Sequence, residues 1–383
     1  MLNFSYWNPV RIEFGKGTIR RLASLIPKEQ KVLLTYGGGS IKQNGVYEQV
    51  RSALRGREVL EFPGIEPNPR YETCLNAVDV ARAEGIGFLL AVGGGSVLDG
   101  TKFIAAAVKY EGEDPWDMLD KGAEFHEALP LGSVLTLPAT GSEMNPFSVI
   151  SRESTGQKLA FSNPCMYPQF SILDPETTFS LPARQVRNGI VDAFVHVFEQ
   201  YMTYDVAAPL QDRQSEAVLQ TLVEVAPVVR ENPNDYDARA TLMWCATNAL
   251  NCSLGCGVPQ DWTTHMIGHE LTAAAGVDHA QTLALVLPAV LSHQRTNKRK
   301  KLLQYGKRVW EIEGTSDETI DAIIRRTVDF FAETGMATRL AECGITKEHR
   351  DRAVAAIRAR GEKLGEHKNI GSDEVAEILA LIP

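Results

Sequence analysis

The sequence predicts an N-terminal α/β domain with a Rossmann-like parallel sheet over residues 1–180 and an all-helical domain over residues 181–383. Three observations support this division. Strand-length apolar runs alternate with helical segments in the first half, which is typical of a parallel sheet covered on both faces. Helical patterns alone follow from about residue 181. The length of 383 residues also suits two domains of roughly 150 residues or more each.

Three apolar runs in the first half are expected to be parallel strands, and each ends in a glycine-rich or polar turn. They are Lys31–Thr35, Gly87–Val92 and Ser133–Leu137. Residues 69–83 and 96–108 have the spacing of helices that connect such strands. Two prolines in the stretch Leu173–Pro182 disfavour helix, which places the domain boundary there.

The second half contains seven segments whose apolar spacing predicts helices, with no convincing strand between them. They are residues 186–203, 211–229, 237–252, 261–275, 279–293, 319–333 and 347–357. A basic run at Lys298–Lys301 is expected to be the solvated face of a further helix.

Composition excludes several classes of partner. The net charge of −9 argues against nucleic acid or an anionic membrane surface as the main partner. No apolar run approaches the ~20 residues of a membrane span, and the N-terminus has no signal-peptide core, so we expect a cytoplasmic protein. The six cysteines form no C-x-x-C pair, and we expect them to be reduced, mostly buried thiols.

Glycine-rich turns after the predicted strands suggest a dinucleotide site. A strand, a glycine-rich turn and a helix N-terminus together present backbone N–H groups to a phosphate. The run Gly-Gly-Gly-Ser at residues 93–96 has this form, with Ser96 expected as a cap and Asp99 in the first helical turn. A second such run occupies residues 37–40, and Thr140–Glu143 follows the third strand. Ligands bind at this edge of open α/β sheets.

The first turn favours NADP over NAD. NAD-preferring sites usually have a carboxylate near the strand end, which binds the ribose 2′-OH. The stretch Thr35–Lys42 has none, and offers backbone N–H groups, the Ser40 hydroxyl and the Lys42 ammonium to a 2′-phosphate.

Histidines and one aspartate predict a metal site in the helical half. Asp192 and His196 stand at i, i+4 on one predicted helix, His265 and His269 do so on another, and His279 begins a third. Imidazole nitrogens with one carboxylate suit Zn²⁺ or Fe²⁺ and do not suit Mg²⁺ or Ca²⁺. The order of a metalloprotease motif is H-E-x-x-H, whereas here the glutamate follows the second histidine, so a hydrolase is disfavoured.

With these motifs the chain resembles the iron-containing (group III) alcohol dehydrogenase family, and particularly its NADP-dependent butanol dehydrogenase or broad-range aldehyde reductase branch. The resemblance runs nearly end to end. It includes the segments Phe14–Gly17, Gly64–Pro69, Ala91–Asp99, Leu137–Glu143, Asp192–His196, His265–Glu270 and Asp278–His279.

The resemblance implies a dehydroquinate synthase-like architecture, usually a homodimer, with NADP(H) on the α/β domain and one Fe²⁺ or Zn²⁺ on the helical domain. The implied metal ligands are Asp192, His196, His265 and His279. His269 lies near the nicotinamide in the family and is not a ligand. The predicted cofactor-binding residues are Gly37, Gly38, Ser40, Gly94, Gly95, Ser96, Asp99, Thr136, Thr140 and Lys158. His269 and Asp99 are the predicted catalytic residues.

The implied reaction is hydride transfer between NADP(H) and small primary alcohols or aldehydes of the butanol type. Two other activities stay open on the same fold. One is a zinc, NAD-dependent polyol dehydrogenase of the glycerol type, and the other is a sugar-phosphate lyase resembling dehydroquinate synthase. The lyase is disfavoured because no obvious cluster of Lys and Arg lies beside the metal helices. A non-catalytic NADP-binding sensor is disfavoured by the intact ligand set.

Overall fold

The structure is a computed structural model that describes all residues from Met1 to Pro383. It divides into two compact units, one formed by Trp7–Leu181 and the other by Met1–Tyr6 with Pro182–Pro383. The first six residues group with the helical unit, where Leu2 N donates to Gly257 O at 2.8 Å. None of the helices has the length and apolarity that crossing a membrane requires.

The α/β unit contains a six-stranded sheet in which every pair of neighbouring strands is parallel. Its spatial order is β1-β8-β5-β4-β2-β3. The strands are β1 (Arg11–Phe14), β2 (Val32–Tyr36), β3 (Val59–Phe62), β4 (Phe88–Gly94), β5 (Leu131–Leu137) and β8 (Phe170–Leu173). A separate antiparallel hairpin consists of β6 (Phe147–Arg152) and β7 (Gln157–Ser162).

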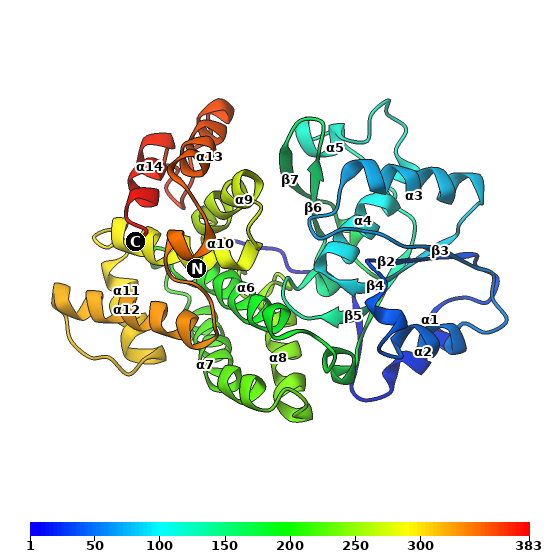
Figure 1. The fold of residues 1–383 in the computed structure, drawn as a ribbon, viewed down its shortest axis with the longest axis horizontal. Coiled ribbons are helices and arrows are strands. Elements are labelled where there is room, and N and C mark those ends of the chain that lie inside the picture. The colour runs from blue at the N-terminus through cyan, green and yellow to red at the C-terminus, as the bar shows by residue number, and fades with distance from the viewer. The chain divides into compact units, whose positions relative to one another are not determined.

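Helices cover both faces of this sheet, and each face has its own apolar core. The α-helices are α1 (Leu22–Leu25), α2 (Val46–Ala53), α3 (Tyr71–Ala83), α4 (Gly95–Lys109) and α5 (Asp117–Asp120). Helices α3 and α4 lie on one face, and α1 and α2 lie on the other (Figure 1). Because successive side chains of a strand point to opposite faces, Leu33 and Leu34 of β2 enter different cores.

The order in which successive strands are added to the sheet reverses between β2 and β4. From β2 the chain continues to β3 at the sheet edge, whereas from β4 it continues to β5 on the other side. Tyr36 of β2 pairs with Val92 of β4, so the turns after these two strands begin side by side. Such a switch point is where open α/β sheets bind their ligands. Both Gly-Gly-Gly-Ser runs therefore lie at the expected ligand-binding edge.

The predicted fold class is confirmed, and the three predicted strands are present as β2, β4 and β5. Sequence reasoning missed β1, β3, β8 and the β6–β7 hairpin. β1, β3 and β8 are only four residues long, which is too short for a clear periodic signal.

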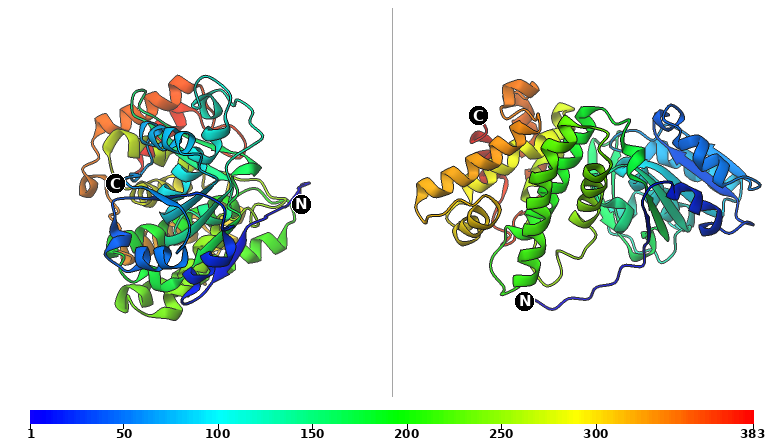
Figure 2. Two further views of the ribbon diagram at one scale, coloured as in Figure 1. Left: turned by 90° about the vertical axis from the view of Figure 1, so that its right-hand side faces the viewer. Right: turned by 90° about the horizontal axis from the view of Figure 1, so that it is seen from below.

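The second unit is built from helices alone, apart from one isolated bridge between Leu364 and Ile370. Its helices, which run from bright green to red, are drawn as coiled ribbons in Figure 2. The helices are α6 (Ala183–Tyr201), α7 (Pro209–Glu231), α8 (Tyr236–Ala249), α9 (Thr263–Ala275), α10 (His279–His293), α11 (Arg299–Val309), α12 (Asp317–Glu333), α13 (Lys347–Arg360) and α14 (Ser372–Ala380). All seven predicted helices are present, and α14 was missed.

Short 3₁₀ helices connect elements in both units. They are η1 (Thr18–Arg21), η2 (Ser40–Lys42), η3 (Ser142–Met144), η4 (Pro164–Met166), η5 (Pro175–Thr178) and η6 (Leu340–Cys343).

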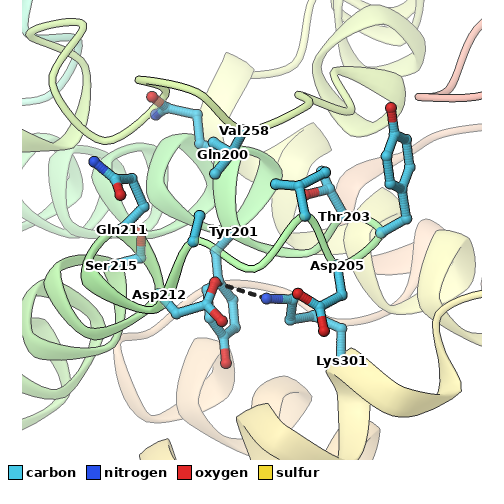
Figure 3. A pocket seen from close by; sticks show the side chains of 12 residues that line it. Gln200, Tyr201, Thr203, Asp205, Gln211, Asp212, Ser215, Val258 and Lys301 are labelled. Atoms are coloured by element: carbon cyan, nitrogen blue, oxygen red, sulfur yellow. Dashed lines mark hydrogen bonds and ion pairs between the residues drawn. The ribbon is translucent and has the colours of Figure 1, made fainter. Parts of the chain in front are cut away.

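The expectation of a solvated basic face at the start of α11 is wrong for two of its four residues. The Lys300 side chain is 82% exposed, but those of Lys298 and Lys301 are 4% and 10% exposed. Lys298 pairs with Asp261 at 2.8 Å, and Lys301 pairs with Asp212 at 2.7 Å beside a small pocket (Figure 3). Residues three apart share a helix face, and here that face is buried against carboxylates from other segments of the chain.

The cysteines also differ from expectation in their burial. All six are thiols without a disulfide, but only Cys74 and Cys245 are buried and the other four are partly exposed.

Candidate cofactor edge and metal centre

Strand β4 leads directly into helix α4, and the N-cap and the first residue of this helix are both glycine. Helix α4 begins at Gly95, and its N-cap is Gly94. A Cβ at Gly94 would lie 2.9 Å from Leu137 Cβ, and one at Gly95 would lie 2.5 Å from Thr140 Oγ1, so both positions need glycine. The expected cap at Ser96 is wrong, because Ser96 is already inside the helix and its hydroxyl accepts from Asn68 N at 3.3 Å.

The expected place of Asp99 in the first helical turn is also wrong, because α4 begins one residue earlier than predicted and its first turn holds no acidic residue. The Asp99 carboxylate accepts from Ser142 Oγ at 2.6 Å and from Val149 N at 3.0 Å. Burial raises the pKa of this carboxyl group, against the attraction of Lys102. Asp99 therefore ties α4 to the segments that follow β5, and its predicted catalytic and cofactor roles stay predictions.

Two further predicted cofactor residues are linked through an asparagine. Lys158 of β7 donates to Asn68 Oδ1 at 2.9 Å, and the backbone N–H of Asn68 donates to Ser96 Oγ. Asn68 adopts a positive φ of 56°, a conformation that asparagine tolerates better than most residues. The structure thus connects Lys158 on the hairpin with Ser96 on α4.

The predicted threonines lie at the same sheet edge. Thr136 is near the end of β5, the parallel neighbour of β4. Thr140 lies in the turn that follows, where its hydroxyl accepts from Ser142 N at 3.2 Å.

A carboxylate on β3 that sequence reasoning missed contacts the end of β2 and the turn that follows it. Glu61 of β3 accepts hydrogen bonds from Tyr36 Oη at 2.8 Å and Tyr47 Oη at 2.5 Å, and pairs with Lys42 Nζ at 3.0 Å. Hydrogen bonds from Tyr47, Lys42 and Tyr36 outweigh burial and lower the pKa of Glu61. The Lys42 ammonium is therefore already paired with an anion. Gly38 and Ser40, in the same turn, are exposed to solvent.

The helical unit brings the predicted metal ligands together around one carboxylate oxygen. Asp192 Oδ1 on α6 lies 3.6 Å from His196 Nδ1 and 3.7 Å from His265 Nε2 on α9. It lies 3.9 Å from His279 Nε2, on the first residue of α10. Ligand atoms of Asp192, His265 and His279 all lie within 4.8 Å of one another. His196 lies beside this group of three, with its ring centroid 4.4 Å from that of His265.

The chemistry of these side chains fits a divalent cation. His196 Nδ1 and His265 Nε2 are buried and have no hydrogen-bond partner, which is costly for polar atoms unless another group satisfies them. Burial lowers the pKa of His196 to about 4 against the attraction of Asp192, so its ring is neutral and able to bind a metal.

His265 behaves differently because a second carboxylate contacts it. Burial alone would lower its pKa, but the charges of Glu199 and Asp192 outweigh burial and raise the pKa to about 9. A cation that binds here displaces the proton and replaces its positive charge. Glu199, on α6, was not singled out in the sequence. Its spacing of three residues from His196 was the available signal.

His269 lies next to the ligand group on α9. Its ring centroid is 4.7 Å from that of His279 and 6.2 Å from that of His265. Glu270 forms an ion pair with Arg360 at 2.8 Å, so its carboxylate is engaged away from these rings. This contact is consistent with the expectation that a metalloprotease is disfavoured.

Comparison with known proteins identifies the family. The family model described as "Iron-containing alcohol dehydrogenase" matches residues 9–175, and the one described as "Fe-containing alcohol dehydrogenase family, C-terminal" matches residues 187–382. NADPH-dependent aldehyde reductase YqhD of Escherichia coli is 54% identical over 97% of both chains. Probable NADH-dependent butanol dehydrogenase 1 of Bacillus subtilis is 42% identical over 99% of both.

Solved structures agree with the sequence matches. The crystal structure of E. coli YqhD has a TM-score of 0.98 at 53% identity, and covers 100% of this chain and 99% of its own. NADH-dependent butanol dehydrogenase A from Thermotoga maritima has a TM-score of 0.95 at 36% identity, with coverage of 100% and 99%. The chain therefore belongs to the iron-containing alcohol dehydrogenase family.

Proposed function

We propose that this protein is a metal-dependent, NADP(H)-linked alcohol dehydrogenase or aldehyde reductase that interconverts small primary alcohols and aldehydes. Family membership supports the reaction class, and the name of the 54% identical relative supports NADPH and aldehyde reduction. The observation that carries the proposal is the convergence of His265 and His279 on Asp192 Oδ1 at 3.7 and 3.9 Å.

Each group of predicted site residues has a distinct task in this proposal. Asp192, His265 and His279 would hold the metal, with His196 as the fourth ligand. When bound, the metal would polarise the aldehyde oxygen as a Lewis acid, and NADPH would supply the hydride.

The cofactor residues would hold the dinucleotide along the sheet edge. Gly94, Gly95 and Ser96 would receive the diphosphate at the N-terminus of α4, where backbone N–H groups point outward. Gly37, Gly38 and Ser40 would receive the 2′-phosphate. His269 would hold the proton that the product oxygen takes up.

The reaction is tested by following NADPH and NADH oxidation with butanal. Turnover should stop after chelation, return when Fe²⁺ or Zn²⁺ is added back, and be at least about tenfold more efficient with NADPH, because charge-assisted hydrogen bonds to the 2′-phosphate contribute roughly 1.5–3 kcal/mol. Relatives at 42% identity are named as NADH-dependent, so the cofactor comparison is informative.

Three other results would contradict parts of the proposal. Chelator-resistant turnover would exclude the metal from the reaction. A strict preference for glycerol and NAD would select the polyol dehydrogenase. The absence of turnover with any simple aldehyde or alcohol, despite bound metal, would favour the lyase or the sensor.

His269→Ala should separate proton transfer from metal binding. The variant is expected to keep one metal per chain, because His269 lies outside the ligand group of Asp192, His265 and His279. Its kcat should fall by roughly 10²–10⁴, the usual contribution of a positioned proton donor. Metal content and kcat are measured on the same preparation. Loss of the metal would show instead that His269 is a ligand.

We also propose a homodimer in the cytoplasm. The family resemblance supports the dimer, and six cysteines without a disulfide suit a reducing compartment. Light scattering after size exclusion should give twice the 42.1 kDa mass of the chain, and fractionation of cells should recover the protein with cytoplasmic enzymes. A monomer mass, or recovery outside the cytoplasm, would contradict the respective proposal.

A further inference from the structure

One carboxylate outside the predicted ligand set contacts both the ring and the backbone of a ligand. Glu199 lies on α6, and its side chain is 3% exposed. Its Oε2 forms a short hydrogen bond with His265 Nδ1. Its Oε1 accepts from the backbone N–H groups of Thr264 at 2.6 Å and of His265 at 3.2 Å.

These contacts determine which ring nitrogen of His265 is available. A carboxylate at Nδ1 keeps the proton on that nitrogen, so the neutral ring presents a lone pair at Nε2. Nε2 is the atom that lies 3.7 Å from Asp192 Oδ1. A carboxylate behind a ligating histidine also raises the basicity of the ring and fixes its orientation.

The backbone contacts fix the position of the ring as well as its tautomer. Thr264 and His265 are the second and third residues of α9, whose first-turn N–H groups have no partner inside the helix. Glu199 satisfies two of them from a neighbouring helix. The ring of His265 and the start of its helix are therefore held by the same side chain.

Glu199 is itself held in place by a second buried network. Its backbone carbonyl accepts from Asp261 N at 2.9 Å. Asp261 accepts from Thr263 Oγ1 at 2.5 Å and pairs with Lys298 at 2.8 Å. Lys298 also pairs with Glu366 at 3.0 Å. The backbone of Glu199 is therefore held in place, which restricts the position of the side chain that orients His265.

We propose that Glu199 is a positioning residue of the metal centre, which selects the tautomer and orientation of His265 and thereby sets the affinity for the divalent cation. This inference rests on the proposed function, because it requires that His265 binds a metal.

Glu199→Gln tests the tautomer directly. The glutamine oxygen still accepts from the backbone N–H groups, but its amide nitrogen donates to His265 Nδ1 and so places the ring proton on Nε2. We expect Zn²⁺ to dissociate about 10–100-fold more readily, measured by competition with a chromogenic chelator. The absorption spectrum of the Co²⁺-loaded protein should change, because His265 no longer binds in the same orientation. Glu199→Asp should recover part of the affinity.

Glu216→Gln is the matched control. Glu216 is a buried carboxylate of the same unit, and it pairs with Arg308 at 2.8 Å. It accepts hydrogen bonds from Tyr201 and Gln304, and its hydrogen-bond partners include no histidine. Its loss should lower the melting temperature and leave the Zn²⁺ affinity unchanged.

The outcomes separate this inference from the proposed function. If the unaltered protein binds Zn²⁺ and Glu199→Gln binds it equally well, the positioning role is wrong and the proposed function stands. If Glu216→Gln weakens Zn²⁺ binding as much as Glu199→Gln, the effect is one of general stability and the positioning role is again wrong. If the unaltered protein binds no divalent metal, the proposed function fails and this inference fails with it.

Discussion

Asp192→Asn is expected to remove the metal and to lower turnover of butanal by at least about 10³. Asp192 supplies the only carboxylate in the group formed with His265 and His279. Its Oδ1 is the atom on which the histidine nitrogens converge, at 3.6 to 3.9 Å. Metal assistance is worth several kcal/mol of transition-state stabilisation, and each 1.4 kcal/mol is tenfold in rate. Metal content and kcat/KM with NADPH are measured together.

Asp237→Asn is the matched control for this substitution. Asp237 is an exposed residue of α8 in the same unit, and its removal should leave both metal and turnover unchanged. Because asparagine has nearly the size of aspartate, Asp192→Asn should fold, and its melting temperature should no longer rise when Zn²⁺ is added. Full turnover in a metal-free Asp192→Asn protein would show that the reaction does not require the metal.

Much of the candidate metal centre was predictable, because Asp192 and His196 lie one helical turn apart and His265 and His269 do the same. The i, i+4 spacing of Asp192 and His196 can be read from the sequence, and in a helix this spacing places the two side chains on the same face. Glu199 could not be assigned a partner in the same way. Its contact with His265 joins two helices, and the crossing of α6 and α9 is decided by packing and not by local spacing.

The cofactor edge was less predictable for a related reason. The two Gly-Gly-Gly-Ser runs indicated a phosphate site, and the sheet order now places both at one switch point. Glu61 was missed because it lies on β3, a four-residue edge strand without a clear pattern. The register that sets Glu61 opposite Leu34 is a property of the assembled sheet. Local sequence around Lys42 therefore could not reveal its ion pair.

The sequence-based prediction failed most clearly for buried charged residues. A basic run such as Lys298–Lys301 is usually solvated, because burying an ammonium without a partner is costly. Here carboxylates from distant segments, Asp261, Asp212 and Glu366, compensate two of the four charges. Only the assembled fold shows that these partners exist.

Lys102→Met is expected to destabilise the α/β unit by about 3–5 kcal/mol, because it leaves buried hydrogen-bonding groups without their donor and removes the charge that opposes the burial of Asp99. Lys102 is fully buried on α4. Its ammonium donates to Ser142 Oγ at 2.8 Å, Asn145 Oδ1 at 3.1 Å and Phe147 O at 2.8 Å. Its charge also opposes the effect of burial on Asp99. The substitution therefore leaves several polar groups without their donor.

Lys102→Met is also expected to weaken the binding of the cofactor. The groups that Lys102 holds belong to the segment after β5 that carries Thr140, so NADPH should bind more weakly in the variant. The melting temperature should fall by on the order of 10 °C for a unit of this size. Lys109→Met, at the exposed end of the same helix, should change stability by less than about 0.5 kcal/mol. Equal melting temperatures for the two variants would mean that the buried ammonium has no structural role, and the network around Asp99 would then have to be explained by Ser142 and Val149 alone.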